Sequence, residues 1–268
     1  GNINDVILYT AAKCGVTRIF NVGGAQAIGA MAYRTESIPK VDKIFGPGNR
    51  YVTCAKQLVS TEVAIDIPAG PSEVAVLADK SSVPAFVGAD LLSQAEHGAD
   101  SQVLLVATSE EVVEQILVEV RDQLALLPRS EIASAALENS TAILTTNIDS
   151  GIEIINEYAP EHLILAIKNA DEVAEKIVNA GSVFIGNYSC ESAGDYASGT
   201  NHTLPTAGFA RSFSGVSLES FVKKITFQKL TASGLWNLGP AIEKMAAAEG
   251  LEAHRRAIAI RLEEIDGF

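Results

Sequence analysis

The chain has 268 residues, of which 47% are hydrophobic, so it can bury one or two ordinary cores and is neither a disordered tail nor a small disulfide-stapled protein. Its 20 Lys and Arg residues against 33 Asp and Glu residues leave a net charge of −13, which excludes a basic surface for nucleic acid. The three cysteines, Cys14, Cys54 and Cys190, include no CxxC pair, which excludes a disulfide framework or a thiolate zinc cage and favours the reducing cytoplasm.

The start of the chain carries no sign of export. No run of about 18 apolar residues is present to cross a membrane, and the first residues lack the charged and then apolar layout of a signal peptide. The chain begins with Gly1 in place of Met and opens on a helical pattern, so we expect that an upstream segment has been removed.

The first 67 residues alternate helical patterns with short β-rich runs. A helix is predicted over Asn4–Cys14 and ends at Gly15, and strands are predicted over Thr17–Val22 and Lys43–Phe45. The first strand runs into a glycine pair and a further helix, as in part of a nucleotide-binding unit. We therefore assign residues 1–67 to a partial nucleotide-binding-like α/β unit.

A second α/β unit is predicted over residues 68–215. After the break PAGPS, helical patterns alternate with five apolar runs, which read EVAVLAD, QVLLVAT, TAILTT, LILAI and SVFIG. This alternation is typical of a parallel sheet covered by helices. The stretch from Asn187 to Ser214 is rich in Gly, Ser, Thr and Asn, and long irregular loops inside a compact domain are usually functional.

Residues 216–268 are predicted to form a C-terminal strand and a helical arm. The strand is expected over Phe221–Leu230, and helical periodicity continues from Thr231 to Glu264 with a break at Gly250. An arm that follows the α/β region in this way is a candidate for dimerisation.

Two of the four histidines lie in helical patterns. His97 follows Gln94 by three residues, so both side chains project from one helix face and could hold one metal ion. Gln is an uncommon metal ligand, so the pair alone is better explained as a polar helix end. His254 follows Glu249 by five residues in the helical arm and by itself is a solvated helix residue.

The other two histidines lie beside acidic residues near predicted strands or loops. In YAPEHL, Glu161 and His162 are adjacent proton-transfer groups, as a general base and a water activator would be, or else His162 caps a turn. The loop SAGDYASGTNHTLPTAG adds Asp195 and His202, of which Asp195 is either a hard metal ligand or an Asx-turn residue.

The glycine loops carry weaker signals. VGGAQAIG and GPGNRY could each cradle a phosphate, but neither is a complete GxGxxG motif, and each could be a simple tight turn. Ser72 in GPSE could be an ordinary cap, because no GxSxG elbow surrounds it.

Together, several blocks of the sequence closely resemble the histidinol dehydrogenase family from end to end. They are VGGAQAIGA, KVDKIFGPGNRYV, DIPAGPSEV, DLLSQAEHGADS, EYAPEHL, GDYASGTNHTLPT and EGLEAHRRA. The resemblance implies two Rossmann-like α/β units, the first incomplete, with a C-terminal helical arm. It also implies an N-terminal truncation, because family members are longer there.

The resemblance implies an activity and a site. The family oxidises L-histidinol to L-histidine through histidinal, in two hydride transfers to NAD, with one zinc ion per site. Four residues match the zinc ligands: Gln94, His97, Asp195 and His254. These four also contact the substrate, together with Ser72, His162 and Glu249.

The remaining roles also follow from the resemblance. His162 would be the base that takes the alcohol proton, and Glu161 would activate the water that attacks the aldehyde. Gln26 and Asn49 would contact NAD, whereas His202 receives no role. The family further implies a cytoplasmic homodimer with shared active sites.

Three alternatives stay open at this point. The first is a related zinc and NAD dehydrogenase that acts on another small polyol, although Ser72, Glu249 and the Glu161–His162 pair favour histidinol. The second is a zinc-binding module that lost catalysis together with its N-terminus. The third is a zinc hydrolase, which would turn over without NAD.

Overall fold

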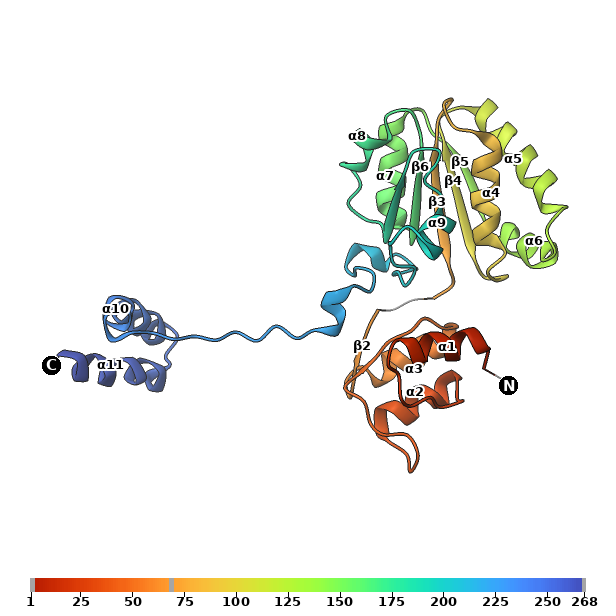
Figure 1. Cartoon of the computed structure of the whole chain (residues 1–268). Coiled ribbons are helices and arrows are strands. Elements are labelled where there is room, and N and C mark those ends of the chain that lie inside the picture. The colour runs from red at the N-terminus through yellow and green to blue at the C-terminus, as the bar shows by residue number, and fades with distance from the viewer. Residues whose placement is uncertain (1–2, 68–69, 267–268) are drawn as a thin grey trace. The chain divides into compact units, whose positions relative to one another are not determined.

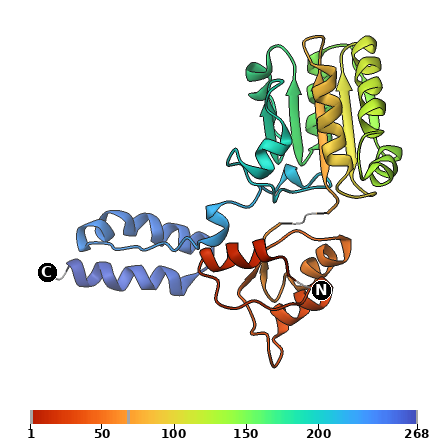
Figure 2. The same ribbon diagram turned by 45° about the vertical axis from the view of Figure 1, so that its right-hand side comes forward.

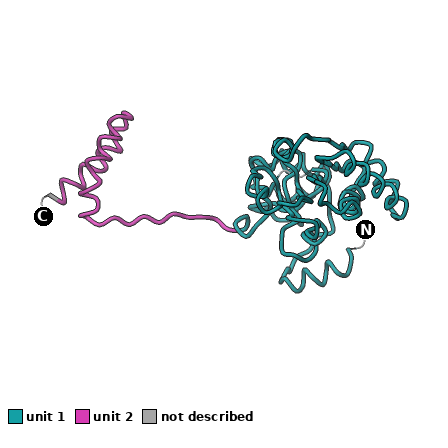
Figure 3. Tube along the Cα trace, turned by 90° about the horizontal axis from the view of Figure 1, so that it is seen from above, with its two compact units in different colours: residues 1–221 teal, residues 222–268 magenta. Residues whose placement is uncertain are grey.

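The computed structural model describes residues 3–67 and 70–266. The chain divides into two compact units, Gly1–Phe221 and Val222–Phe268, which Figure 3 colours separately. The finer division at residues 67 and 215 stays a prediction. Within the described ranges, none of the helices combines the length and the apolar composition that a membrane crossing requires.

A five-stranded parallel sheet forms the centre of the first unit, in the order β5-β4-β3-β6-β7 (Figure 1). Its strands are β3 (Glu73–Ala78), β4 (Gln102–Ala107), β5 (Thr141–Leu144), β6 (His162–Ala166) and β7 (Ser182–Ile185). The first of these five strands in the chain, β3, lies at the centre, and the later strands are added outward on each side, which is the doubly wound arrangement. The α/β class predicted from the sequence is confirmed.

Helices cover both faces of this sheet (Figure 2). One face is covered by α4 (Pro84–Ala95), α5 (Glu110–Leu124) and α6 (Ser130–Glu138), and the other by α7 (Ile148–Tyr158) and α8 (Ala170–Ala174). Strand β3 supplies both cores, because successive side chains point to opposite faces. Val74 and Val76 pack into the first core, and Ala75 and Leu77 pack into the second.

A smaller core lies near the start of the chain. It is built from α2 (Gly24–Tyr33), β1 (Lys43–Ile44), α3 (Arg50–Val59) and β2 (Ala64–Ile65), and α1 (Asp5–Lys13) precedes it. The two strands pair in parallel. Lys56 of α3 is buried here and forms an ion pair with Asp66, whose other carboxylate oxygen accepts from the Gly46 amide at 2.7 Å. This network fixes the start of the GPGNRY loop.

Two predicted strands are absent. Neither Thr17–Val22 nor Phe221–Leu230 forms a ladder with another strand in the described part of the chain. A strand is stabilised by hydrogen bonds to a neighbour and by burial of alternate side chains, and both are missing here. Phe20 is 41% exposed and Phe227 is 90% exposed. The β-rich composition of these segments therefore gives extended chain without a sheet.

The second unit is a helical hairpin, as the break at Gly250 predicted. Helices α10 (Ala232–Ala248) and α11 (Glu252–Asp266) flank that glycine, which has a φ of +70°. In the first unit, the glycine-rich stretch contains only the short helices α9 (Glu191–Tyr196) and η1 (Phe209–Arg211), and η2 (Leu218–Phe221) follows it.

Candidate functional site

The candidate site lies at the amino-terminal edge of the five-stranded sheet. In the parallel register of β3 and β6, Val74 lies opposite His162, so both strands begin at the same edge. Glu73 and Glu161 lie at the same edge. Ligands of doubly wound sheets usually bind outside the carboxyl ends of the strands, so this site uses the opposite edge.

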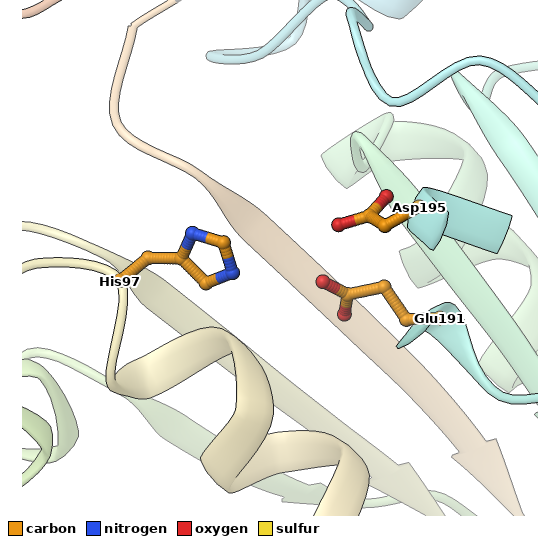
Figure 4. A group of neighbouring side chains, drawn as sticks. All are labelled: His97, Glu191 and Asp195. Carbon is orange, nitrogen blue, oxygen red and sulfur yellow. The ribbon is translucent and has the colours of Figure 1, made fainter. Parts of the chain in front are cut away.

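Two helices bring further side chains to this edge. Helix α4 leaves the carboxyl end of β3 and returns along the sheet, so Gln94 in its last turn reaches the amino edge, and His97 follows directly. Helix α9 carries Glu191 and Asp195, four residues apart and therefore on one face. Figure 4 shows the His97 ring facing both carboxylates. One ligand atom from each of these three residues lies within 4.8 Å of the other two.

Gln94 and Glu191 form a buried pair at the base of this group. Gln94 is 1% exposed and Glu191 is 2% exposed. With the Gln94 amide oriented so that its nitrogen faces Glu191, that nitrogen donates to Oε2 at 3.0 Å and also to Oε1. Burial, together with the negative charges of Asp195, Glu161 and Asp90, raises the pKa of Glu191 to about 9.

His162 is buried with its two ring nitrogens in different environments. Nδ1 lies 3.2 Å from the Glu73 backbone oxygen, and because a carbonyl only accepts, Nδ1 carries the proton and Nε2 the lone pair. Nε2 lies 3.5 Å from Oδ1 of Asp195 and makes no hydrogen bond within the described ranges. Burial lowers the pKa of His162 below its ordinary 6.5, so the ring is neutral at pH 7.

Glu161 is held next to this imidazole by backbone contacts. Its Oε2 accepts from the Glu73 amide at 2.9 Å and lies 3.7 Å from Nδ1 of His162. The pKa of Glu161 is raised to about 8, chiefly by burial; the hydrogen bond from the Glu73 amide opposes this rise, and the charges of Glu73 and Asp195 add to it. Gly181 packs so closely that a Cβ there would lie 2.5 Å from the Glu161 carbonyl oxygen.

Glu73 also ties the glycine-rich loop to the sheet. Its Oε1 accepts from the Ala207 amide at 2.8 Å, and the Gly70 amide donates to Oγ1 of Thr206 at 2.6 Å nearby. Burial raises the pKa of Glu73, while the hydrogen bond from Ala207 lowers it. The loop that carries Asp195 is therefore anchored at the same edge as His162.

The structure gathers five of the predicted site residues, which are Gln94, His97, Glu161, His162 and Asp195. Ser72 precedes Glu73 at the same edge, half-buried, and its carbonyl accepts from the Gln102 amide at 3.1 Å. Glu249 and His254 are exposed residues of the second unit, and His202 is exposed in the first.

The two predicted NAD contacts lie at the starts of helices. Gln26 is exposed in the first turn of α2, directly after the glycine pair. Asn49 caps α3, where its Oδ1 accepts from the amides of Tyr51 at 3.1 Å and Val52 at 3.2 Å. The cap uses only the side-chain oxygen of Asn49, and the residue is exposed.

Sequence reasoning missed two acidic residues of the site, Glu191 and Glu73. A signal existed for each. Glu191 precedes Asp195 by four residues, which is one helical turn, and Glu73 opens a predicted buried strand at the point where a charged residue is unusual.

Comparison with known proteins identifies the relatives of this chain. The family model described as histidinol dehydrogenase matches residues 1–262. The histidinol dehydrogenase of Bacteroides thetaiotaomicron is 62% identical over 263 residues, which cover 98% of this chain and 61% of that protein. The Yersinia pestis histidinol dehydrogenase is 55% identical over 263 residues, with 97% and 59% covered.

A solved structure of a histidinol dehydrogenase also matches this chain. The crystal structure of histidinol dehydrogenase from Elizabethkingia anophelis is 61% identical and superimposes with a TM-score of 0.96, covering 99% of this chain and 62% of that one. The chain thus spans about three fifths of the length of these relatives. On the match to the family model and the fold that it shares, the chain belongs to the histidinol dehydrogenase family.

Proposed function

We propose that the chain belongs to a cytoplasmic, zinc-containing dehydrogenase that oxidises L-histidinol to L-histidine through histidinal, with NAD as hydride acceptor. The observation that carries the proposal is the gap between Nε2 of His162 and Oδ1 of Asp195. Two acceptors face each other there at 3.5 Å, an arrangement that a shared proton or a cation resolves. A base and metal-type donors thus occupy one site.

The donor set fits a zinc ion. An imidazole nitrogen of His97 and carboxylate oxygens of Asp195 and Glu191 lie close together, Gln94 adjoins Glu191, and zinc accepts nitrogen and oxygen ligands of these kinds. We assign the ion to Gln94, His97 and Asp195, with His254 from the second unit. When bound, zinc supplies a fixed positive charge that anchors and orients the substrate.

His162 is assigned the first proton transfer. Its neutral ring presents the lone pair of Nε2, and the carbonyl of Glu73 holds the opposite nitrogen protonated. Nε2 takes the hydroxyl proton of the alcohol while a hydride leaves the carbinol carbon, which gives the aldehyde.

Glu161 is assigned the second step. A water molecule adds to the aldehyde carbon and passes a proton to the Glu161 carboxylate, which gives the anion of the aldehyde hydrate. Departure of a second hydride from this anion then gives the carboxylic acid. Oε2 of Glu161 lies 3.7 Å from Nδ1 of His162, and this closeness supports assigning both groups to one substrate.

The remaining contacts complete the assignment. Gln26 and Asn49 would hold NAD, whose nicotinamide accepts each hydride, at the amino ends of α2 and α3. Ser72 would contact the substrate, and the negative charge of Glu249 would suit its ammonium group.

The test is NADH formation by the zinc-loaded chain on addition of L-histidinol and NAD. Two molecules of NADH should form for each histidinol consumed, and chelation of zinc should stop the reaction. Zinc binding without NADH would indicate a binding module, turnover without NAD a hydrolase, and oxidation of other polyols alone a related dehydrogenase; each result would contradict the proposal.

A further inference from the structure

We propose that Glu191 is a positioning residue that turns the Gln94 side chain so that its oxygen, and not its nitrogen, faces the zinc ion. This inference rests on the zinc site of the proposed function. It assigns a role to a buried carboxyl group that the proposed reaction does not use.

A carboxamide has two ends of nearly equal shape, and only one of them suits a metal. The oxygen carries lone pairs, whereas the NH₂ group has two donor hydrogens and no available pair. Gln94 is buried at the end of α4, so its amide cannot rely on water to choose the orientation. A neighbouring group must therefore select it.

Glu191 supplies this selection through both carboxylate oxygens. One end of the Gln94 amide lies 3.0 Å from Oε2 and also close to Oε1, and when that end is the nitrogen it donates to both. The positive charge of a bound zinc ion favours the ionised form of Glu191, whose two oxygens only accept. A turn of the amide by half a rotation would then place its oxygen against two acceptors in a buried site, which costs a lost hydrogen bond and an unsatisfied donor. The NH₂ end is thereby held on Glu191, and the oxygen is left for the ion.

Glu191 differs in its contacts and its exposure from the residues that are assigned as zinc ligands. Its carboxylate is occupied by the amide of Gln94 and is 2% exposed, whereas the side chain of Asp195 is 17% exposed and His97 is exposed at the mouth of the site. All three ligand-type atoms lie within 4.8 Å, so a direct role for Glu191 is the competing explanation that the experiment must exclude.

A double-mutant cycle on zinc affinity makes the distinction. The zinc dissociation constant is measured by competition with a chromogenic chelator for the unmodified chain, Glu191→Leu, Gln94→Ala and the double variant. Because outer-shell partners of metal ligands are worth about 10- to 100-fold in affinity, Glu191→Leu should weaken zinc binding by that factor. The double variant should bind like Gln94→Ala alone, since Glu191 acts only through Gln94.

Two further variants serve as controls. Glu191→Gln keeps an acceptor oxygen and should recover at least about tenfold of the affinity lost in Glu191→Leu. Glu172→Ala on α8 removes one exposed acidic group elsewhere and should bind zinc like the unmodified chain. Thermal unfolding of the metal-free variants reports their folding. If Glu191→Leu does not fold, the cobalt-loaded Glu191→Gln chain should keep the visible absorption spectrum of the unmodified cobalt form.

The outcomes are distinct. If the unmodified chain binds no zinc, the proposed zinc site itself is wrong, and this inference is wrong with it. If the unmodified chain binds zinc and Glu191→Leu binds it equally well, only the inference is overturned. Additive losses in the double variant, or a changed cobalt spectrum in Glu191→Gln, would make Glu191 a ligand and would also overturn it.

Discussion

At the scale of single residues, Glu161 combines a buried position with a proposed role that requires charge. Burial raises the pKa of its carboxyl to about 8, and the Glu73 amide holds one oxygen in place at 2.9 Å. The group is therefore poised between protonated and ionised forms near neutral pH, which suits a base that accepts a proton from water and returns it.

This assignment predicts that the two oxidation steps respond differently to Glu161→Gln. Water enters only the oxidation of the aldehyde, so this step should slow by about 100-fold or more, whereas oxidation of the alcohol should change far less. Single-turnover measurements with histidinol and with histidinal separate the two steps. Equal slowing of both would make Glu161 a general electrostatic element.

The same carboxyl should affect stability in a pH-dependent way. Its pKa is raised from 4.5 to about 8 on folding, so its contribution to the stability of the metal-free chain is full below pH 4.5 and is lost as the pH rises to about 8. Glu161→Gln stays neutral throughout. Its melting temperature minus that of the unmodified chain should therefore increase from about pH 5 to about pH 9. A difference that does not change with pH would mean that Glu161 does not titrate in this range.

At the scale of secondary structure elements, the site depends on the close approach of the segments that precede β6 and β7. The Gly181 amide donates to the Pro160 carbonyl at 2.9 Å, and the Ser182 amide donates to the Glu161 carbonyl at 2.9 Å. A side chain at residue 181 would enter the space that Glu161 occupies.

Gly181→Ala should therefore destabilise the chain by about 1 to 3 kcal/mol and displace Glu161, with a loss of aldehyde oxidation. Gly29→Ala in α2 is the matched control, because an added Cβ there meets no atom within 4 Å. It should stabilise the chain by about 0.4 to 1 kcal/mol. Chemical denaturation measures both changes, and a Gly181→Ala chain as stable as the unmodified one would contradict the close packing.

The elements also explain which parts of the fold could be predicted from sequence. The buried strands β3, β4 and β6 and their helices follow from apolar runs that alternate with helical periodicity, because both signals are local. Thr17–Val22 has the same local signal and forms no strand, since pairing depends on a neighbour that periodicity does not reveal.

The candidate site also has a part that could be predicted from the sequence and a part that could not. Glu161 and His162 are adjacent in the sequence, so their partnership could be predicted directly. Glu191 and Glu73 each carried a local signal, but their roles could not be assigned from it, because their contacts arise only where α9 meets α4 and where β3 lies beside β6. The parallel register and the return of α4 are tertiary features, and they decide which acidic residues join the site.

At the scale of the whole molecule, the proposed zinc ligands are divided between the two units, because His254 belongs to the second. The second unit is a hairpin in which Gly239 of α10 lies so close to Leu262 of α11 that a Cβ would come within 2.7 Å of it. Arg255 of α11 forms an ion pair across the hairpin with Glu243 of α10 at 3.6 Å and one within α11 with Glu252 at 2.6 Å. A preformed arm of this kind could present His254 to its own chain or to a second copy.

We expect the arm to cross to a second copy in a two-fold dimer with shared sites. Inactive His97→Ala and inactive His254→Ala chains are mixed, refolded together and assayed for NADH formation. A mixed dimer with shared sites has one site with both changes and one site with neither. Because half of the dimers are mixed, about a quarter of the unmodified activity should return. No recovery, with mixed dimers demonstrated by mass, would place each site within one chain.

At the amino edge of β3 and β6, we assign proton transfer and metal binding to different residues. The most direct test of this separation measures zinc content and NADH formation together for His162→Asn and Asp195→Ala. His162→Asn should keep its zinc and lose about 100-fold or more in turnover, whereas Asp195→Ala should lose its zinc. A His162→Asn chain that loses zinc and keeps its turnover would contradict the account.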